Sequence, residues 1–170
     1  MKTVKKQHAP VAFNLPAAQA QIVRSESGKE KTVAQIRSEA LRITSMPKTH
    51  THEDNLQYDV YSLWNLNFRD RSFAWHTPNG GSRDKAEAMQ LKGQGVRSGV
   101  PDILIMTRKA RMLFIELKNG HHRYDPNQAL FAHKAFSYGF EDVFICGSLT
   151  EVAALLCHIF DVAPDTLLLR

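Results

Sequence analysis

The sequence has little of several features that define other classes of protein. It contains two cysteines, Cys146 and Cys157, and both lie in apolar segments. We therefore expect buried free thiols in a reducing compartment rather than a disulfide or a metal-binding pair. No apolar run approaches the length of a membrane span, and no secretory apolar segment follows the basic start. These absences predict a soluble, cytoplasmic protein with no membrane partner.

Positive charge is concentrated near the start of the chain. Residues 1–48 hold nine Lys/Arg and three Asp/Glu, a net of +6, whereas residues 49–170 hold thirteen and fourteen, a net of −1. This shift predicts a basic N-terminal arm over residues 1–48 and a second domain over residues 49–170. A basic segment is typical of nucleic-acid contact, but it is equally typical of a solvated tail, and the composition favours neither.

The arm is expected to be partly irregular, with a short helix near residues 17–24 and a firmer one over residues 32–43. Thr32 is the expected N-cap of the second helix, which docks either on the core or on a partner chain. The remaining periodicities predict helices over residues 53–68, 83–94, 126–138 and 149–160, with strands at 72–77 and 143–146. Together with a central hairpin, this order is typical of a mixed α/β sheet flanked by helices.

Two apolar runs, Ile103–Met106 and Met112–Ile115, are separated by the polar residues 107–111. They predict a buried hairpin that turns about Lys109 or Ala110. Antiparallel pairing then places Asp102 opposite Glu116 or Lys118, and the last two share one face of their strand because they are two residues apart. Three charged side chains therefore converge at one end of an apolar hairpin.

This convergence has two interpretations, and the spacing alone leaves both open. A salt-bridged trio at a strand end would compensate the buried charges. Alternatively, two carboxylates form a site for a hard divalent cation such as Mg²⁺ or Mn²⁺. A lysine beside such a site can stabilise the charge that develops in a phosphoryl transition state.

These residues, in this order, resemble the PD-(D/E)xK nuclease core, and most of all its virus-type replication-repair nuclease branch, the VRR-Nuc domain. The resemblance covers about residues 53–156. It implies a restriction-endonuclease-like fold with a mixed central sheet of about four strands flanked by helices. The matching segments are Pro78–Gly81, Gly99–Leu104, Phe114–Gly120 and Pro126–Gln128.

The resemblance also implies a set of site residues. Glu53, Asp102 and Glu116 would hold Mg²⁺ or Mn²⁺ together with the backbone carbonyl of Leu117, while Lys118 acts at the phosphate. From the sequence alone, Glu53 can also serve only to complement its helix dipole. The auxiliary residue would be Gln128 at a helix start. The candidate DNA contacts are Gln57, His76, Asn79, Lys92, Arg97 and Arg123; His76 and Asn79 can equally serve only to shape their turn, and the charges of Lys92 and Arg97 are as typical of a solvated loop.

The implied activity is metal-dependent DNA hydrolysis by an endonuclease. Stand-alone domains of this family resemble four-way junction resolvases that act as dimers, so branched DNA, a homodimer, a bacterial or phage source and the absence of an organic cofactor are expected. Three alternatives stay open: a nuclease of flaps, nicks or specific sites, a non-catalytic DNA-binding module, and a structural protein whose charged residues form an ion-pair cluster. Composition does not distinguish DNA from RNA.

Overall fold

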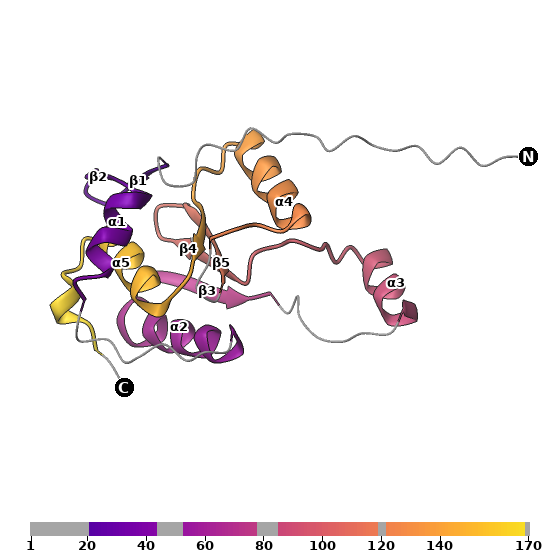
Figure 1. Cartoon of the computed structure of the whole chain (residues 1–170), viewed down its shortest axis with the longest axis horizontal. Helices are drawn as coiled ribbons and strands as arrows, with labels where there is room; N and C mark the ends of the chain where they lie inside the picture. The colour runs from indigo at the N-terminus through magenta and orange to yellow at the C-terminus, as the bar shows by residue number, and fades with distance from the viewer. Residues whose placement is uncertain (1–20, 44–52, 78–84, 119–121, 169–170) are drawn as a thin grey trace, which may run out of the picture.

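The computed structural model describes residues 21–43, 53–77, 85–118 and 122–168, without the side chains of Glu53, Asp54 and Lys85. The central sheet (Figure 1) has four strands in the order β3-β4-β5-β6. The β3–β4 and β4–β5 pairs are antiparallel, and the β5–β6 pair is parallel. The expected mixed α/β sheet is confirmed and is consistent with a PD-(D/E)xK-like core. Its strands are β3 (Ser72–His76), β4 (Ile103–Thr107), β5 (Met112–Leu117) and β6 (Val143–Cys146).

Helices cover both faces of this sheet. The elements α2 (Glu53–Asn67) and α5 (Leu149–Ile159) pack on one face, while α4 (Pro126–Ser137) packs on the other. The short helix α3 (Lys85–Gly93) stands away from the sheet in Figure 1, and a 3₁₀ turn, η1 (Pro164–Thr166), follows α5. All of these helices except η1 were expected within a few residues of their observed bounds.

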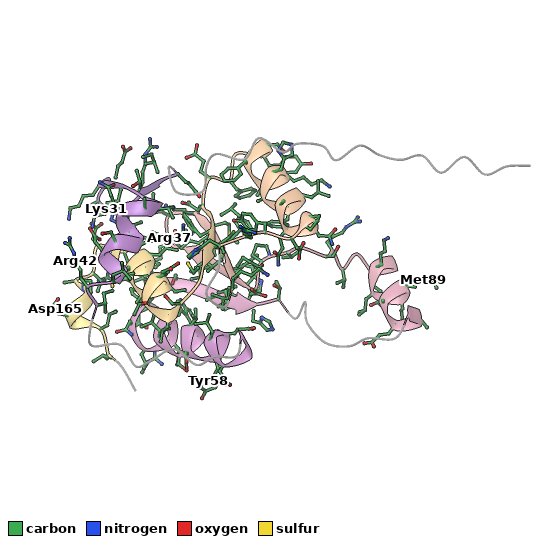
Figure 2. The ribbon with its side chains drawn as sticks, viewed as in Figure 1. Lys31, Arg37, Arg42, Tyr58, Met89 and Asp165 are labelled. Carbon is green, nitrogen blue, oxygen red and sulfur yellow. The ribbon has the colours of Figure 1, made fainter. Side chains whose placement is uncertain are left out.

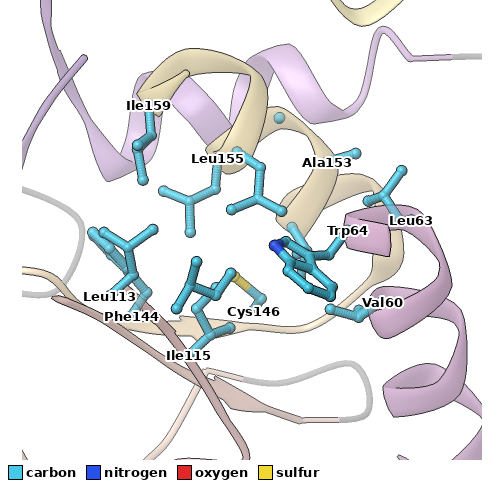
Figure 3. Packing of buried hydrophobic residues seen from close by; sticks show 14 of the residues in the cluster. Val60, Leu63, Trp64, Leu113, Ile115, Phe144, Cys146, Ala153, Leu155 and Ile159 are labelled. Carbon is cyan, nitrogen blue, oxygen red and sulfur yellow. The ribbon is translucent and has the colours of Figure 1, made fainter. Parts of the chain in front are cut away.

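The β4–β5 hairpin forms the middle of the core because it is apolar on both faces. Ile103 pairs with Ile115, and both side chains belong to the cluster that contains Val60, Trp64 and Leu155 (Figure 3). On the opposite face Leu104 and Phe114 contact the α4 side of the core. The turn lies where the sequence places it: Ala110 has a φ of 56°, and the Thr107 N–H donates to the Arg111 carbonyl at 2.9 Å. Both cysteines are buried and free, as expected.

The N-terminal segment differs from the expectation. Residues 22–24 form a strand, β1 (Ile22–Arg24), paired with β2 (Glu30–Thr32), so the helix expected near residues 17–24 is wrong over its described part. The β-branched pair Ile22-Val23 favours a strand, and Gly28 at a φ of 89° closes the turn. Thr32 is confirmed as the N-cap of α1 (Val33–Ala40), which ends three residues before the expected end. The expected boundary between residues 48 and 49 lies outside the described residues.

Residues 22–40 pack on the common core, which answers the question of where α1 docks. Val23 is fully buried, and its carbonyl lies 2.9 Å from Nε2 of the buried His158 on α5. Ile36 and Ala40 join the same apolar cluster from α1. The segment therefore contributes to the stability of the fold.

We predict that Val23→Ala lowers the free energy of unfolding by about 2 kcal/mol, because it removes two fully buried methyl groups. Chemical denaturation would measure the change. Leu41→Ala, at a position that is 87% exposed, is the control and should change the stability little. Equal effects of the two substitutions would contradict the docking of β1 on α5.

Candidate metal centre

The charged residues meet where β4 begins and β5 ends. Since Ile103 pairs with Ile115, continuation of the ladder places Asp102 beside Glu116 on the α4 face of the sheet. The N–H of Leu117 donates to Oδ2 of Asp102 at 2.8 Å, which ties the two strands together at this end. The hairpin thus fixes the Asp102 carboxylate next to that of Glu116.

Glu116 is the buried centre of this group. The residue is only 2% exposed, and Nζ of Lys118 lies 2.9 Å from its Oε1 atom. Gln128 Nε2 donates to the same oxygen. The other oxygen, Oε2, is buried and has no hydrogen-bond partner among the described residues. Two groups therefore compensate the burial of one carboxylate oxygen of Glu116, and no described group compensates the burial of the other.

Gln128 reaches the centre because of the way α4 begins. Asp125 is the N-cap, its side chain accepts from the N–H groups of Asn127 and Gln128, and Pro126 fills the first turn. The Gln128 Oε1 atom accepts from the Asp125 N–H at 2.9 Å, which completes a capping box. The same side-chain amide thus caps the helix through its oxygen and contacts Glu116 through its nitrogen.

Burial has an electrostatic consequence for Glu116. Desolvation, followed by the nearby charge of Asp102, raises the pKa of Glu116 from 4.5 to about 7, although Lys118 acts in the opposite direction. Desolvation also raises the pKa of Tyr124, which lies just before α4. Near neutral pH, the charged form of Glu116 is only marginally favoured without a further positive charge.

The described residues fit a hard divalent cation. Asp102 and Glu116 offer adjacent carboxylate oxygens, and the buried Oε2 atom lacks the partner that a cation would supply. No group of three metal-ligating side chains occurs among residues 21–43, 55–77, 86–118 and 122–168. Glu53 is the first residue of α2, and its side chain is not described, so its role as a ligand stays a prediction.

The other predicted residues are distributed over several elements. Nδ1 of His76, at the end of β3, lies 3.0 Å from the Asp102 carbonyl oxygen. Gln57 lies on α2, and the exposed Arg123 precedes α4. Asn79 falls outside the described residues. Lys92 and Arg97 line a groove of about 650 Å³ between α3 and α4, together with Lys134.

Two features of the surroundings were missed by the sequence analysis. Lys134 was not singled out, although its place on the exposed side of a helix that begins at Gln128 could have indicated it. The second is a partly buried network in which Glu151 contacts Nε2 of His122 at 2.8 Å and Nε of Arg37 at 3.5 Å. Its members come from α5, the segment after Lys118 and α1, and no local signal links them.

Comparisons with known proteins give one likeness. A solved structure described as a VRR_NUC domain is similar to this chain, with 24% sequence identity and a TM-score of 0.44, over 65% of this chain and 100% of that chain. No family model matches the chain, and no curated protein matches it. No helix in the described part of the chain has both the length and the apolar character needed to cross a membrane.

We predict that Glu116→Gln stabilises the metal-free protein at about pH 8 by 1–3 kcal/mol, because it removes a charge whose burial is unfavourable. Because the pKa of Glu116 is raised in the folded state, the unmodified protein has its full stability below the ordinary value of 4.5 and loses part of it as the pH rises through about 7. The gain should therefore disappear in acid. Thermal unfolding in a chelator across this pH range would measure it, and a gain that was constant with pH would contradict the assignment.

We also predict that Gly99→Ala displaces the start of α4. Gly99 has a φ of +82°, and a Cβ there would overlap the backbone of Asn127 and lie 2.7 Å from the Gln128 nitrogen. The expected loss is about 2–4 kcal/mol in the free energy of unfolding, from steric overlap and backbone strain together. The matched control is Gly95→Ala, where φ is +95° but nothing lies within 4 Å, so that only the conformational cost of about 1 kcal/mol remains.

Proposed function

We propose that this protein is a divalent-metal-dependent nuclease that hydrolyses phosphodiester bonds in DNA. The observation that carries the proposal is the buried Glu116 carboxylate, with one oxygen compensated by Lys118 and Gln128 and the other without a partner beside Asp102. A purely structural ion-pair cluster would satisfy both oxygens, since a buried unpaired atom is costly. The arrangement therefore favours the metal site over the structural alternative.

Each residue has a distinct part in the proposed reaction. Asp102 and Glu116 would hold Mg²⁺ or Mn²⁺, with Glu53 and the Leu117 carbonyl as the further ligands that the sequence resemblance implies. When bound, such an ion polarises the scissile phosphate and lowers the pKa of water. Lys118, fixed by its ion pair to Glu116, keeps a positive charge where negative charge develops on the phosphate or where the attacking water is oriented.

Gln128 and the Leu117 N–H act on the two carboxylates. Gln128 fixes the rotamer of Glu116, and the Leu117 N–H fixes that of Asp102, so that the oxygens are oriented before substrate arrives. In the hydrolysis itself, water oxygen bonds to phosphorus, one P–O ester bond breaks, and the leaving oxygen is protonated. Prior orientation of the carboxylates lowers the cost of assembling this arrangement.

The groove that Lys92, Arg97 and Lys134 line supports contact with the phosphate backbone. Its described lining residues include three cations and no carboxylate. By contrast, residues 21–43 hold four cations that form ion pairs within the fold: Arg24–Glu30, Lys29–Asp161, Lys31–Glu39 and Arg37–Glu151. We therefore assign the main phosphate contacts to the α3–α4 groove rather than to this part of the basic segment.

The finer proposal is structure-specific cleavage of branched DNA by a homodimer in the cytoplasm of a bacterial or phage-infected cell. It is supported by the resemblance of the motifs to those of junction-cleaving enzymes, which use two-fold symmetry to cut two strands. Cleavage of flaps or nicks by the same chemistry is the second candidate, and a panel of linear, nicked, flap and four-way DNA in Mg²⁺ separates the two.

We predict that Lys118→Ala lowers the single-turnover cleavage rate by at least about a hundredfold, because it removes the charge at the reacting phosphate. DNA binding should change by less than about threefold, since binding depends mainly on the other phosphate contacts. Lys118→Arg should restore little, because the planar guanidinium has a different shape and reach from the compact ammonium.

Rapid mixing with labelled DNA and a separate binding titration in Ca²⁺ would measure both effects. Arg108→Ala, in the hairpin turn at the other end of β4, is the control and should cleave normally. A loss that was confined to binding would make Lys118 a phosphate anchor. Absence of any metal-dependent cleavage by the unmodified protein would refute the proposed function.

A further inference from the structure

An aromatic groove runs along the outer edge of the sheet, beside the candidate metal centre. It has a volume of about 680 Å³ and lies between α2 and the edge strand β3. Four of the residues that line it are aromatic: Tyr58, Tyr61, Phe73 and Trp75. Among the described residues, the rest of the lining is made of Gln57, Ala74, His76 and Ile103, and none of these lining residues carries a carboxylate.

These aromatic rings are unusually open to solvent. Tyr58 is 73% exposed and Phe73 is 59% exposed, and Tyr61 is also exposed. Figure 2 shows Tyr58 on the solvent-facing side of α2. The ring centroids of Phe73 and Trp75 are 5.6 Å apart, so the two rings form one continuous apolar surface. Exposed aromatic clusters of this kind commonly mark a binding surface.

The groove approaches the candidate centre at His76. His76 lines the groove and also contacts the Asp102 carbonyl oxygen through Nδ1 at 3.0 Å. The next residue, Thr77, donates its backbone N–H to the same carbonyl at 3.0 Å. A nucleotide chain with a phosphate at Asp102 and Glu116 can therefore place its neighbouring bases over β3.

We propose that this groove binds unpaired nucleotides by stacking their bases on Tyr58, Phe73 and Trp75. Bases within a duplex already stack on one another, so their faces are not available to protein rings. Aromatic platforms therefore select single-stranded segments, and each stacked base contributes to affinity without reading the sequence. The inference rests on the proposed function for its biological sense and, of the two candidate substrates, favours flaps with unpaired bases beside the cut over fully paired four-way junctions.

The chemistry of the lining favours a nucleic acid over a second copy of this chain. Ala74 and Ile103 are buried, so the exposed surface is formed by aromatic faces and by the polar groups of Gln57, His76 and the two tyrosines. Flat rings with hydrogen-bonding edges suit bases, and no carboxylate is among the described lining residues to repel a polyanion. Aromatic side chains are also enriched at dimer interfaces, so the nearness of His76 to Asp102 is what favours a nucleic acid here.

The test is a binding titration of the full chain in Ca²⁺, with fluorescent oligothymidine of about ten nucleotides and a duplex of the same length as probes. Tyr58→Ala and Phe73→Ala should each weaken binding of the single strand by about five- to tenfold, because each removes one stacking surface. Binding of the duplex should stay within about twofold of the unmodified protein. Tyr58→Phe should bind like the unmodified protein, because stacking needs the ring and not the hydroxyl.

The matched control is Tyr138→Ala, at the far end of α4, where the residue is 78% exposed and lies outside this groove. It should leave both affinities unchanged. Single-strand binding by Tyr58→Ala and Phe73→Ala that equals that of the unmodified protein would overturn the inference. So would conversion of a dimer to a monomer by either substitution, measured by sedimentation, because the groove would then be an interface between copies. Cleavage is not part of this assay, so failure of the proposed nuclease activity is detected separately.

Discussion

The burial of the Glu116 carboxylate is the constraint on which the surrounding structure depends. A strand that is apolar on both faces ends in a charge that is almost completely removed from water. Such a charge is tolerated only when hydrogen bonds and an opposite charge replace its hydration. Lys118 and Gln128 supply this replacement at one oxygen only. This incomplete compensation is the observation on which the proposed cation site rests.

Several local features follow from the need to bring the start of α4 to this carboxylate. The amide of Gln128 is held from both sides, by the Asp125 N–H and by Glu116, so its orientation is fixed by the capping box. The chain before β4 must then cross the first turn of α4 at close range, and only a glycine at position 99 leaves room for the backbone of Asn127. Helix capping, loop conformation and the candidate site are therefore one coupled arrangement, and a change in any of them displaces the others.

Much of this site could be predicted from the sequence because its signals are local. The β4–β5 register follows from the alternation of side chains and a short turn, and the Asp125–Gln128 cap follows from residues that are three apart. The β1–β2 hairpin was missed because two three-residue strands carry almost no periodicity. The contacts of Arg37 and His122 with Glu151 join residues that are 114 and 29 positions apart and share no element, so only the folded chain reveals them. The expected ligand Glu53 is the first residue of α2, and its side chain lies outside the described part, so its role stays a prediction.

Two surfaces of different chemistry flank the candidate centre, and they act over different distances. The cationic groove between α3 and α4 attracts any polyanion. Its contribution to affinity falls as the salt concentration rises, because the release of counterions from the nucleic acid is then less favourable. The aromatic groove along β3 acts only at contact and responds weakly to salt. Residues 49–170 carry a net charge of −1, so long-range attraction by this part of the chain is modest. In the proposed nuclease, discrimination between nucleic-acid structures would then depend mainly on short-range contacts, where the position of a phosphate and the availability of an unpaired base are tested together.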